Sequence, residues 1–375
     1  MLTALDDTLM HQCAELFAHT SVSDHRFFDR NVHGVHAPDG SLNLSTSFGV
    51  YKNNNVMDGF AMLQHDGARQ FNHRYSRRLD QNYDDVAIGA LSVEILEPLV
   101  SARLRLAPGD HVGSYDIVWT AVLEPHLEDR HYRRHGGRIV RDHLRTSQFG
   151  KASGWINIED KRTDFKDWFA WRDHSWGVRP GVGGFEPNTG SLEKNNGWLG
   201  IFNWWLTEEA GCLFQLQEDG DGNRLYLNGN IAFRDGKPPL TIIDAKHDIR
   251  FYESTRRYRT LTLELTAHDG SKWVVEAESI GRPWVYRGGG YDHGYNDGRG
   301  LGVWRGDFLE EHDQYDISHP EDAVFPDGKV LRPMHREQFA RVTINGKPGQ
   351  AYTPVISTGP NKRYGFEGTA EVMPG

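Results

Sequence analysis

Residues 168–180 hold the densest set of chemically useful side chains in the sequence, with three Trp, two Arg, Asp173 and His174. Such a stretch is too polar for a strand in an ordinary core. An ionisable pair beside large aromatic rings is what a site needs if burial is to shift a pKa and the rings are to bind an apolar molecule. Asp173 and His174 are therefore our first candidates for catalytic residues.

In extended geometry, alternate side chains of this segment fall on opposite faces. The two faces hold Arg172, His174 and Trp176 on one side, and Trp171, Asp173 and Ser175 on the other. A structural alternative stays open, in which Asp173 pairs with Arg172 or Arg179 and the Trp rings fill the end of a barrel. A serine nucleophile is disfavoured, because Ser175 adjoins His174 and no Gly-x-Ser-x-Gly elbow occurs.

A second dense segment, residues 288–300, carries Tyr291, Asp292 and His293 among several glycines. These glycines do not form a phosphate loop, since no Gly-Lys-Ser/Thr follows them and no helical pattern begins there. The segment is either a flexible hairpin loop or a loop at the mouth of a barrel. In the second case it carries Tyr291, Asp292 and His293 into the cavity as further candidate catalytic residues.

The 19 histidines make a metal site worth considering. The sequence has no His-x-His, His-Glu-x-x-His or Cys-x-x-Cys, which are spacings typical of local metal sites. Cys13 and Cys212 lie far apart in the chain, as is typical of two buried thiols in a reduced protein. We therefore expect no metal, no other cofactor and a cytoplasmic protein.

Period-two alternation dominates the elements that must position these residues, which predicts strands with one buried face. The alternating runs span residues 42–50, 91–95, 100–106 and 115–123, then a second series between residues 198 and 277 and a late strand at 342–344. Turn dipeptides such as Asn345-Gly346 punctuate the second series. The pattern predicts an all-β fold of antiparallel barrels or sandwiches. One short helix is also expected, because apolar residues recur at spacings of three and four between residues 2 and 17.

A Gly-rich segment at residues 177–197 separates the two strand series. We place a domain boundary within it, near Ser191. The predicted organisation is an N-terminal helix at residues 1–22, a first β-domain at 23–190 and a second β-domain at 191–375.

The chain has 375 residues and a formal net charge of -10, which opposes a nucleic-acid partner because such partners require a basic surface. Basic residues do cluster between residues 130 and 141, with acidic residues among them. We interpret this cluster as a solvated turn, with an anion or interface patch as the alternative. The apolar stretch at residues 197–207 is much shorter than the roughly 20 residues that span a bilayer, so no membrane anchor is expected. The oligomeric state stays open.

The segment Trp171-Arg172-Asp173-His174-Ser175-Trp176-Gly177-Val178-Arg179-Pro180 resembles the lipocalin-like hydratase superfamily, which includes carotenoid 1,2-hydratases, kievitone hydratase and the AttH-like proteins. Further stretches in a similar order are residues 29–31, 51–54, 148–150 and 290–292. The likeness covers most of residues 24–300, and its specific core is Asp-His-Ser-Trp-Gly. It implies two lipocalin-like β-domains side by side, with a cavity for a hydrophobic small molecule where they meet.

Adding water to an isolated double bond, or removing it from an alcohol, requires an acid, a surface that stabilises a cation and a base for water. A protonated carboxyl in apolar surroundings, aromatic faces and an imidazole supply these groups. The candidate catalytic residues are Asp173, His174, Tyr291, Asp292 and His293, and the candidate substrate-binding residues are Trp171, Trp176, Arg179, Trp198, Trp204 and Trp205.

The resemblance thus implies a cofactor-independent lyase, a hydratase or dehydratase that acts on an isoprenoid, steroid-like or aromatic compound. Another non-hydrolytic lyase, an isomerase or a cyclase in the same cavity stays open, as does a lipocalin-like carrier without chemistry. A carrier has no need of Asp and His side chains beside its apolar wall, which distinguishes it from the enzymes.

Overall fold

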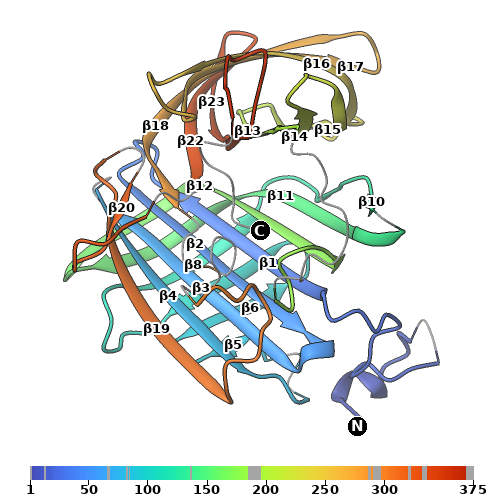
Figure 1. Cartoon of the computed structure of the whole chain (residues 1–375), viewed down its shortest axis with the longest axis vertical. Helices are drawn as coiled ribbons and strands as arrows, with labels where there is room; N and C mark the ends of the chain where they lie inside the picture. The colour runs from blue at the N-terminus through green and yellow to red at the C-terminus, as the bar shows by residue number, and fades with distance from the viewer. Residues whose placement is uncertain are drawn as a thin grey trace.

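The computed structural model describes residues 2–11, 14–65, 68–81, 83, 85–135, 137–184, 196–285, 289, 297–319, 322–331 and 336–368. Within these ranges the chain is built almost entirely of strands, arranged as one large antiparallel sheet and one closed antiparallel barrel (Figure 1). The prediction of an all-β protein is confirmed. Over the same ranges, no helix is long and apolar enough to cross a membrane.

The large sheet combines the first half of the chain with three later strands. Its strands are β1 (Phe27–His36), β2 (Leu42–Tyr51), β3 (Val56–His65), β4 (Arg69–Arg78), β5 (Ala87–Ile88), β6 (Leu91–Glu97), β7 (Ser101–Leu106), β8 (Ser114–Ala121), β9 (His126–Leu127), β10 (His131–His135), β11 (Arg138–Ile158), β12 (Lys161–Val178), β19 (Phe308–Asp316), β20 (Ala323–Val324) and β21 (Val330–Leu331). The order is β21-β20-β19-β4-β3-β2-β1-β12-β11-β8-β7-β6-β5, and β9 and β10 also pair with β11. The period-two alternation places Leu44, Phe48 and Trp119 in one core on the inner face.

The barrel is formed by the second strand series. Its strands are β13 (Trp198–Leu206), β14 (Ala210–Asp219), β15 (Arg224–Phe233), β16 (Leu240–Phe251), β17 (Tyr258–Ala267), β18 (Lys272–Val285), β22 (Arg336–Ile344) and β23 (Lys347–Tyr352). It closes because β13 pairs with both β14 and β23, and β24 (Val355–Thr358) extends the pairing along β13. The barrel encloses its own core, which includes Ile201, Trp205 and Phe214.

The hairpin between β22 and β23 has the turn that its sequence predicts. Ile344 pairs with Lys347, which leaves a two-residue loop of Asn345 and Gly346. Both loop residues have positive φ, 49° and 79°, the conformation that Asn-Gly adopts in tight hairpins.

The predicted N-terminal helix is wrong. The only helical segments among the described residues are two 3-10 turns, η1 (Ala4–Asp7) and η2 (Lys52–Asn54). The Asp6 carboxylate accepts hydrogen bonds from the backbone N–H of both Thr3 (2.6 Å) and Phe17 (2.9 Å). A continuous helix would hold residues 6 and 17 about 16 Å apart, so this contact requires a folded-back chain. Leu9 is fully exposed, so it does not pack as the apolar side of a helix would.

The two halves of the chain do not correspond exactly to the sheet and the barrel. The predicted boundary near Ser191 lies outside the described residues, and the barrel begins shortly after it, at Trp198. β19 then leaves the barrel series and pairs with β4 of the large sheet over Phe308 to Asp316 (Figure 1). The division into 23–190 and 191–375 stays a prediction, to which the structure adds this return of the chain to the large sheet.

The outer face of the barrel packs against the large sheet through an apolar cluster drawn from both. The Trp171 ring of β12 stacks on Tyr352 of β23 with ring centroids 4.2 Å apart, and it meets Trp204 of β13 edge-on at 5.4 Å. His36 of β1 stacks on Phe339 of β22 at 3.9 Å. Such ring pairs contribute roughly 0.5–1.5 kcal/mol each beyond the burial of apolar area, so they fix the barrel against the sheet.

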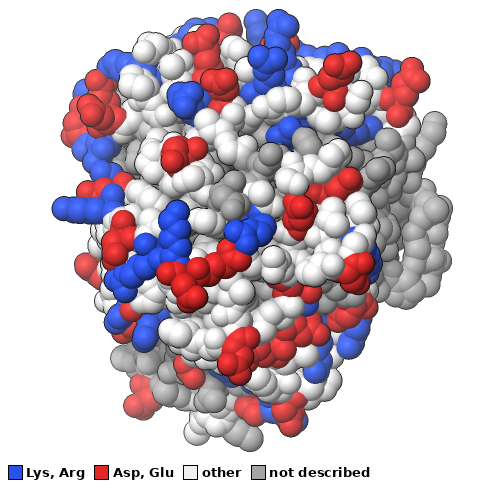
Figure 2. Space-filling view, turned by 90° about the vertical axis from the view of Figure 1, so that its left-hand side faces the viewer, with Lys and Arg blue, Asp and Glu red and all other residues white. Residues whose placement is uncertain are grey.

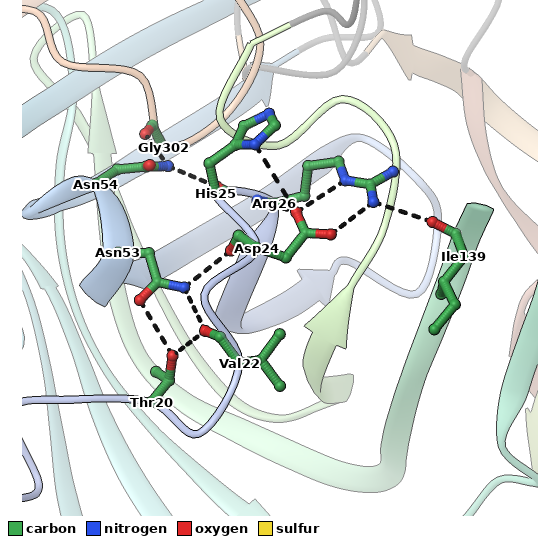
Figure 3. Close-up of polar contacts among 9 residues, drawn as sticks. All are labelled: Thr20, Val22, Asp24, His25, Arg26, Asn53, Asn54, Ile139 and Gly302. Atoms are coloured by element: carbon green, nitrogen blue, oxygen red, sulfur yellow. Dashed lines mark hydrogen bonds and ion pairs between the residues drawn. The ribbon is translucent and has the colours of Figure 1, made fainter.

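Polar side chains fasten the segment that precedes β1 (Figure 3). The Asn53 amide donates to the carbonyl oxygens of Val22 (2.7 Å) and Asp24 (2.9 Å). Arg26 makes a two-point ion pair with Asp24 (2.9 and 2.6 Å) and donates to the carbonyl of Ile139 on β11 at 3.0 Å. Further hydrogen bonds join Thr20 to Asn53, and Asn54 to His25 and Gly302. These contacts give residues 53 and 54, part of the stretch that resembles the hydratase superfamily, a structural role.

The charged surface is mixed in sign. On the face drawn in Figure 2, basic and acidic side chains lie interleaved, with ion pairs between many neighbours elsewhere on the sheets, such as Arg130 with Asp142 (2.6 Å). Surface pairs of this kind contribute little to stability, about 0–1 kcal/mol each.

Because histidines such as His36 are buried, we expect the protein to lose stability in mild acid. Burial lowers the pKa of His36 from 6.5 to about 4. Between these two values the unfolded chain binds a proton that the native chain does not, so the free energy of unfolding falls as the pH falls, by up to about 1.4 kcal/mol per pH unit for one such group. We expect His36→Asn, which keeps a donor for the Ala37 carbonyl, to reduce this slope by about that amount in urea unfolding at several pH values.

The control is His19→Asn, because His19 is exposed. It should leave the slope unchanged. An unchanged slope in His36→Asn would show that His36 is not held neutral by burial.

Candidate functional site

A cavity of about 200 Å³ lies where the large sheet meets the outer face of the barrel. Strands β1, β11 and β12 form one wall, and β13, β14 and β23 form most of the other. The first wall carries Arg30, Arg141, Arg145, Asp173 and Arg179, and the second carries Trp198, Phe202, Trp204 and Tyr352. The cavity therefore places a charged surface opposite an aromatic one.

The alternation of β12 decides which of its residues reach the cavity. Trp171, Asp173 and Ser175 line it, as their shared face in extended geometry predicts. The other face carries Arg172 and His174, which point away from the cavity.

Strand register brings basic residues next to this face. Ser175 lies between Arg30 of β1 and Arg145 of β11, and His143 of β11 lies opposite Gly177. Gly177 has φ of 134°, and a Cβ there would lie 2.3 Å from the carbonyl oxygen of Asp142. Glycine is needed at this position for β11 to lie so close to β12.

Asp173 is an acidic group that β12 contributes to the cavity. Its side chain is half-buried and makes no hydrogen bond or ion pair with any residue that the structure describes. Burial raises the pKa of Asp173, and this effect outweighs the opposite influence of Arg145, Arg179 and Arg30. The environment thus favours the protonated carboxyl, which is the form that donates a proton.

The structural alternative, an ion pair between Asp173 and Arg172 or Arg179, is not formed. Arg172 donates twice to Gln148 Oε1, at 2.9 and 2.6 Å, and its guanidinium lies 4.6 Å from the Trp119 ring centre. Arg179 lines the cavity with its guanidinium 4.7 Å from the centre of the Phe28 ring.

His174 lies on the opposite side of β12 from Asp173. Its Nε2 is 2.7 Å from Asp29 Oδ1, and both side chains are about half exposed, 48% and 50%. Its ring contacts Trp176 on the same face, with centroids 5.1 Å apart. The structure therefore does not bring Asp173 and His174 together in one site.

The remaining candidates divide into three groups. Trp171, Trp198, Trp204 and Arg179 line the cavity. Trp205 points into the barrel and is fully buried in its core. Tyr291, Asp292 and His293 lie outside the described residues.

Sequence reasoning missed His143, a buried imidazole on the cavity wall. Neither of its ring nitrogens has a hydrogen-bond partner among the described residues. Burial lowers the pKa of His143 well below its usual range, and Arg145, His131 and Arg141 add to this effect, so the ring is neutral. The available signal was the alternation of Arg141, His143 and Arg145, which places all three on one face of a strand.

The basic cluster at residues 130–141 is only partly a solvated turn. Arg133 and Arg134 are exposed, but His131 and Arg141 line the cavity. His131 stacks on His143 with centroids 4.6 Å apart, and its Nε2 lies 3.0 Å from Glu128 Oε2.

A second group of imidazoles lies apart from the cavity. The rings of His73, His111 and His312 have centroids 4.7–5.0 Å apart, and the Nδ1 atoms of His73 and His312 are 2.8 Å apart. These two nitrogens bond to each other rather than converge on an ion. Among the residues that the structure describes, no three His, Cys, Asp or Glu side chains are arranged to hold a metal.

A large sheet and a closed barrel that share one cavity define a lipocalin-like, two-part β-protein. Its fold is similar to that of an AttH-like protein from Nitrosomonas europaea, with a TM-score of 0.52, 12% identity, and coverage of 90% of this chain and 94% of that one. The chain belongs to a family of unknown function (DUF8625), whose model matches residues 2–367. The predicted resemblance to the lipocalin-like hydratase superfamily is confirmed at the level of the fold.

Two further solved structures are more distantly similar. Kievitone hydratase from Nectria haematococca has a TM-score of 0.40 and 11% identity over 88% of this chain and 87% of that one. CghA with Sch210972 has a TM-score of 0.43 and 8% identity over 88% of both chains. Both TM-scores are too low to assign any property of these proteins to this chain. No curated protein matches the sequence.

The environment of Asp173 predicts the sign of a stability change. Burial raises the pKa of Asp173 in the native state, so the ionised form of Asp173 destabilises that state. The destabilisation is absent below the ordinary pKa of Asp, and it develops as the pH rises through the pKa of the native state. We expect Asp173→Asn to raise the melting temperature at pH 8, and to raise it less at pH 4.

Asp116→Asn is the matched contrast. Arg103 donates to both oxygens of Asp116, at 2.8 and 2.7 Å, and these hydrogen bonds lower the pKa of Asp116. This variant should lose stability at pH 8. A loss of about 3–5 kcal/mol in Asp173→Asn would instead indicate a buried ion pair.

Proposed function

We propose that the chain is an enzyme that adds water to, or removes water from, a hydrophobic small molecule held between the sheet and the barrel. The main support for this proposal is the environment of Asp173. Its carboxyl has a raised pKa, has no partner among the described residues and faces a cavity whose opposite wall is aromatic. A carboxyl whose pKa is raised in this way is better suited to act as a general acid than an exposed Asp.

One carboxyl is sufficient for the proton balance. In dehydration, Asp173 protonates the ligand's hydroxyl oxygen, the C–O bond breaks and water leaves. The adjacent carbon then loses a proton as the double bond forms, and this proton restores the carboxyl. In hydration, Asp173 protonates one alkene carbon, water adds to the other, and the proton that this water loses returns to Asp173.

The walls of the cavity influence the charge that develops. Aromatic side chains line the cavity, and aromatic rings stabilise positive charge on carbon. Arg30 and Arg145 flank Asp173 and oppose such charge. A long-lived cation is therefore disfavoured, and cleavage of the C–O bond and loss of the proton from the adjacent carbon are expected to be nearly concerted.

His143 is the imidazole that the cavity offers in place of His174. His143 pairs in the strand register with Gly177, which lies four residues from Asp173 along β12. This corresponds to about 13 Å between the backbone positions of Gly177 and Asp173. The neutral ring therefore serves a different part of the ligand from Asp173, as an acceptor or donor that orients it.

Other non-hydrolytic lyases, isomerases and cyclases are the second candidate, because they use the same acid in the same cavity. A carrier without chemistry is less well supported. A buried carboxyl without a partner adds nothing to the binding of an apolar molecule, since a polar group left unpaired is costly to bury.

The test begins with compounds that bind the protein. A panel of terpenoids, steroids and phenols is screened for quenching of Trp fluorescence and for a raised melting temperature, since a ligand that binds only the native state stabilises it. Each binder is incubated with the enzyme, and the product is analysed by mass spectrometry for the gain or loss of one water. We expect Asp173→Asn to bind the compound and to lower turnover by about 100-fold or more.

Asp167→Asn is the matched control, because Asp167 lies exposed on the same strand and its positive φ of 58° suits Asn. It should retain full turnover. A product of unchanged mass would favour an isomerase or cyclase, and binding without any product would favour a carrier. Normal turnover in Asp173→Asn would remove Asp173 from the mechanism.

A further inference from the structure

One end of the cavity is rich in arginine. Arg141 lies one residue beyond the last register pair of β11 with β12, which is Asp142 with Val178, and this places it beside Arg179. Both arginines line the cavity, as does Arg145 four residues further along β11. The aromatic contacts of Trp171 lie at the opposite end of the same face of β12.

Arg141 has no counter-ion among the residues that the structure describes. Its side chain is half-buried against the cavity, and it makes no hydrogen bond or ion pair with any described residue. Burial lowers the pKa of Arg141 to about 10, and the charges of Arg179, Arg145 and Arg133 add to this shift. A guanidinium with like charges around it favours an anion that arrives from outside.

Apart from Asp173, the described carboxylates near this wall are paired with other residues. Glu128 lies 3.0 Å from His131 Nε2, accepts a hydrogen bond from Ser147 at 2.9 Å and lies 3.8 Å from Arg145.

On the other strands, Asp58 faces Arg30 at 3.3 Å and accepts from Tyr51 at 3.0 Å. Asp142 is paired with Arg130. Glu337, the carboxylate that the described residues of the barrel contribute to the cavity, forms no ion pair with Arg141.

We propose that the ligand of this cavity is an organic anion, whose carboxylate or phosphate binds Arg141 while its apolar body lies against the aromatic wall. This inference rests on the proposed function, which supplies the hydrophobic ligand. It names the chemical class of that ligand, an elongated amphipathic acid, and it assigns Arg141 as the residue that selects it.

The separation along the strand sets the length of the ligand. Residues 173 and 179 are six apart on β12 and its extension, which corresponds to about 20 Å between backbone positions. The long Arg141 side chain shortens the span that the ligand must bridge. A molecule with its acid group at Arg141 and its reacting group at Asp173 therefore has a chain or fused-ring body between them.

The experiment compares three probes that share one aromatic body: 1-naphthylacetate, 1-naphthyl phosphate and the neutral 1-naphthylacetamide. Their affinities are measured by calorimetry. The wild-type protein should bind at least one of the two anions about tenfold or more tightly than the amide, the scale of a charge-assisted hydrogen bond. Which anion binds more tightly distinguishes a carboxylate ligand from a phosphate ligand.

The variants Arg141→Met and Arg138→Met locate the anion. Arg138 lies on the same strand and carries the same charge, but it is exposed and does not line the cavity. Arg141→Met should abolish the preference for the anion and leave the affinity for the amide unchanged, whereas Arg138→Met should keep both. Arg141→Met should also melt at the same or a higher temperature without ligand, because it removes a charge that its neighbours repel.

Several results would overturn the inference. Equal affinity of the wild-type protein for anions and amide would overturn it while leaving a ligand cavity in place. Loss of the preference in both variants alike would assign the anion to the surface, and a marked fall in the melting temperature of Arg141→Met would reveal an internal partner. If none of the probes binds, the anion site fails, whereas the proposed function is decided separately by the turnover of Asp173→Asn.

Discussion

The stacking of Trp171 on Tyr352 fixes the barrel against the large sheet, and the rest of the site depends on it. Because side chains alternate along a strand, burying Trp171 in this interface also turns Asp173 and Ser175 toward the barrel. The same contact turns His174 to the other side of β12, where it pairs with Asp29. The position of one aromatic ring thus decides which polar residues of the strand are enclosed.

Enclosure then acts in the same way on three ionisable groups of the cavity. Burial raises the pKa of Asp173 and lowers those of His143 and Arg141, so in each case the charged form is disfavoured. A fold selected only for stability would fill such a space with apolar side chains. The cavity instead keeps an acid, a neutral imidazole and a guanidinium, and none of the three has a hydrogen-bond or ion-pair partner among the described residues. This indicates that a ligand from outside completes the site.

Local rules predicted the all-β fold, the Asn345-Gly346 hairpin and the two faces of β12, because each follows from the residues of one short segment. Register between distant strands is not encoded in that way. His143 reaches the cavity only because β11 pairs with β12 opposite Gly177, and β19 joins the large sheet only through its pairing with β4. The helix expected near the N-terminus is absent from the described residues for a related reason: apolar spacing stabilises a helix only where the apolar side chains pack, and Leu9 is fully exposed.

Binding of an anion at the arginine end would change the acid at the other end. Arg145, Arg179 and Arg30 each hold the pKa of Asp173 down, although burial still raises it overall. An anion beside these arginines offsets part of their positive potential, and in a cavity of low dielectric this effect extends farther than it does in water. The pKa of Asp173 therefore rises further when the anionic ligand is bound. The ligand that presents a group to be protonated would thus itself favour the protonated form of the carboxyl that donates the proton, which couples recognition at Arg141 to chemistry at Asp173.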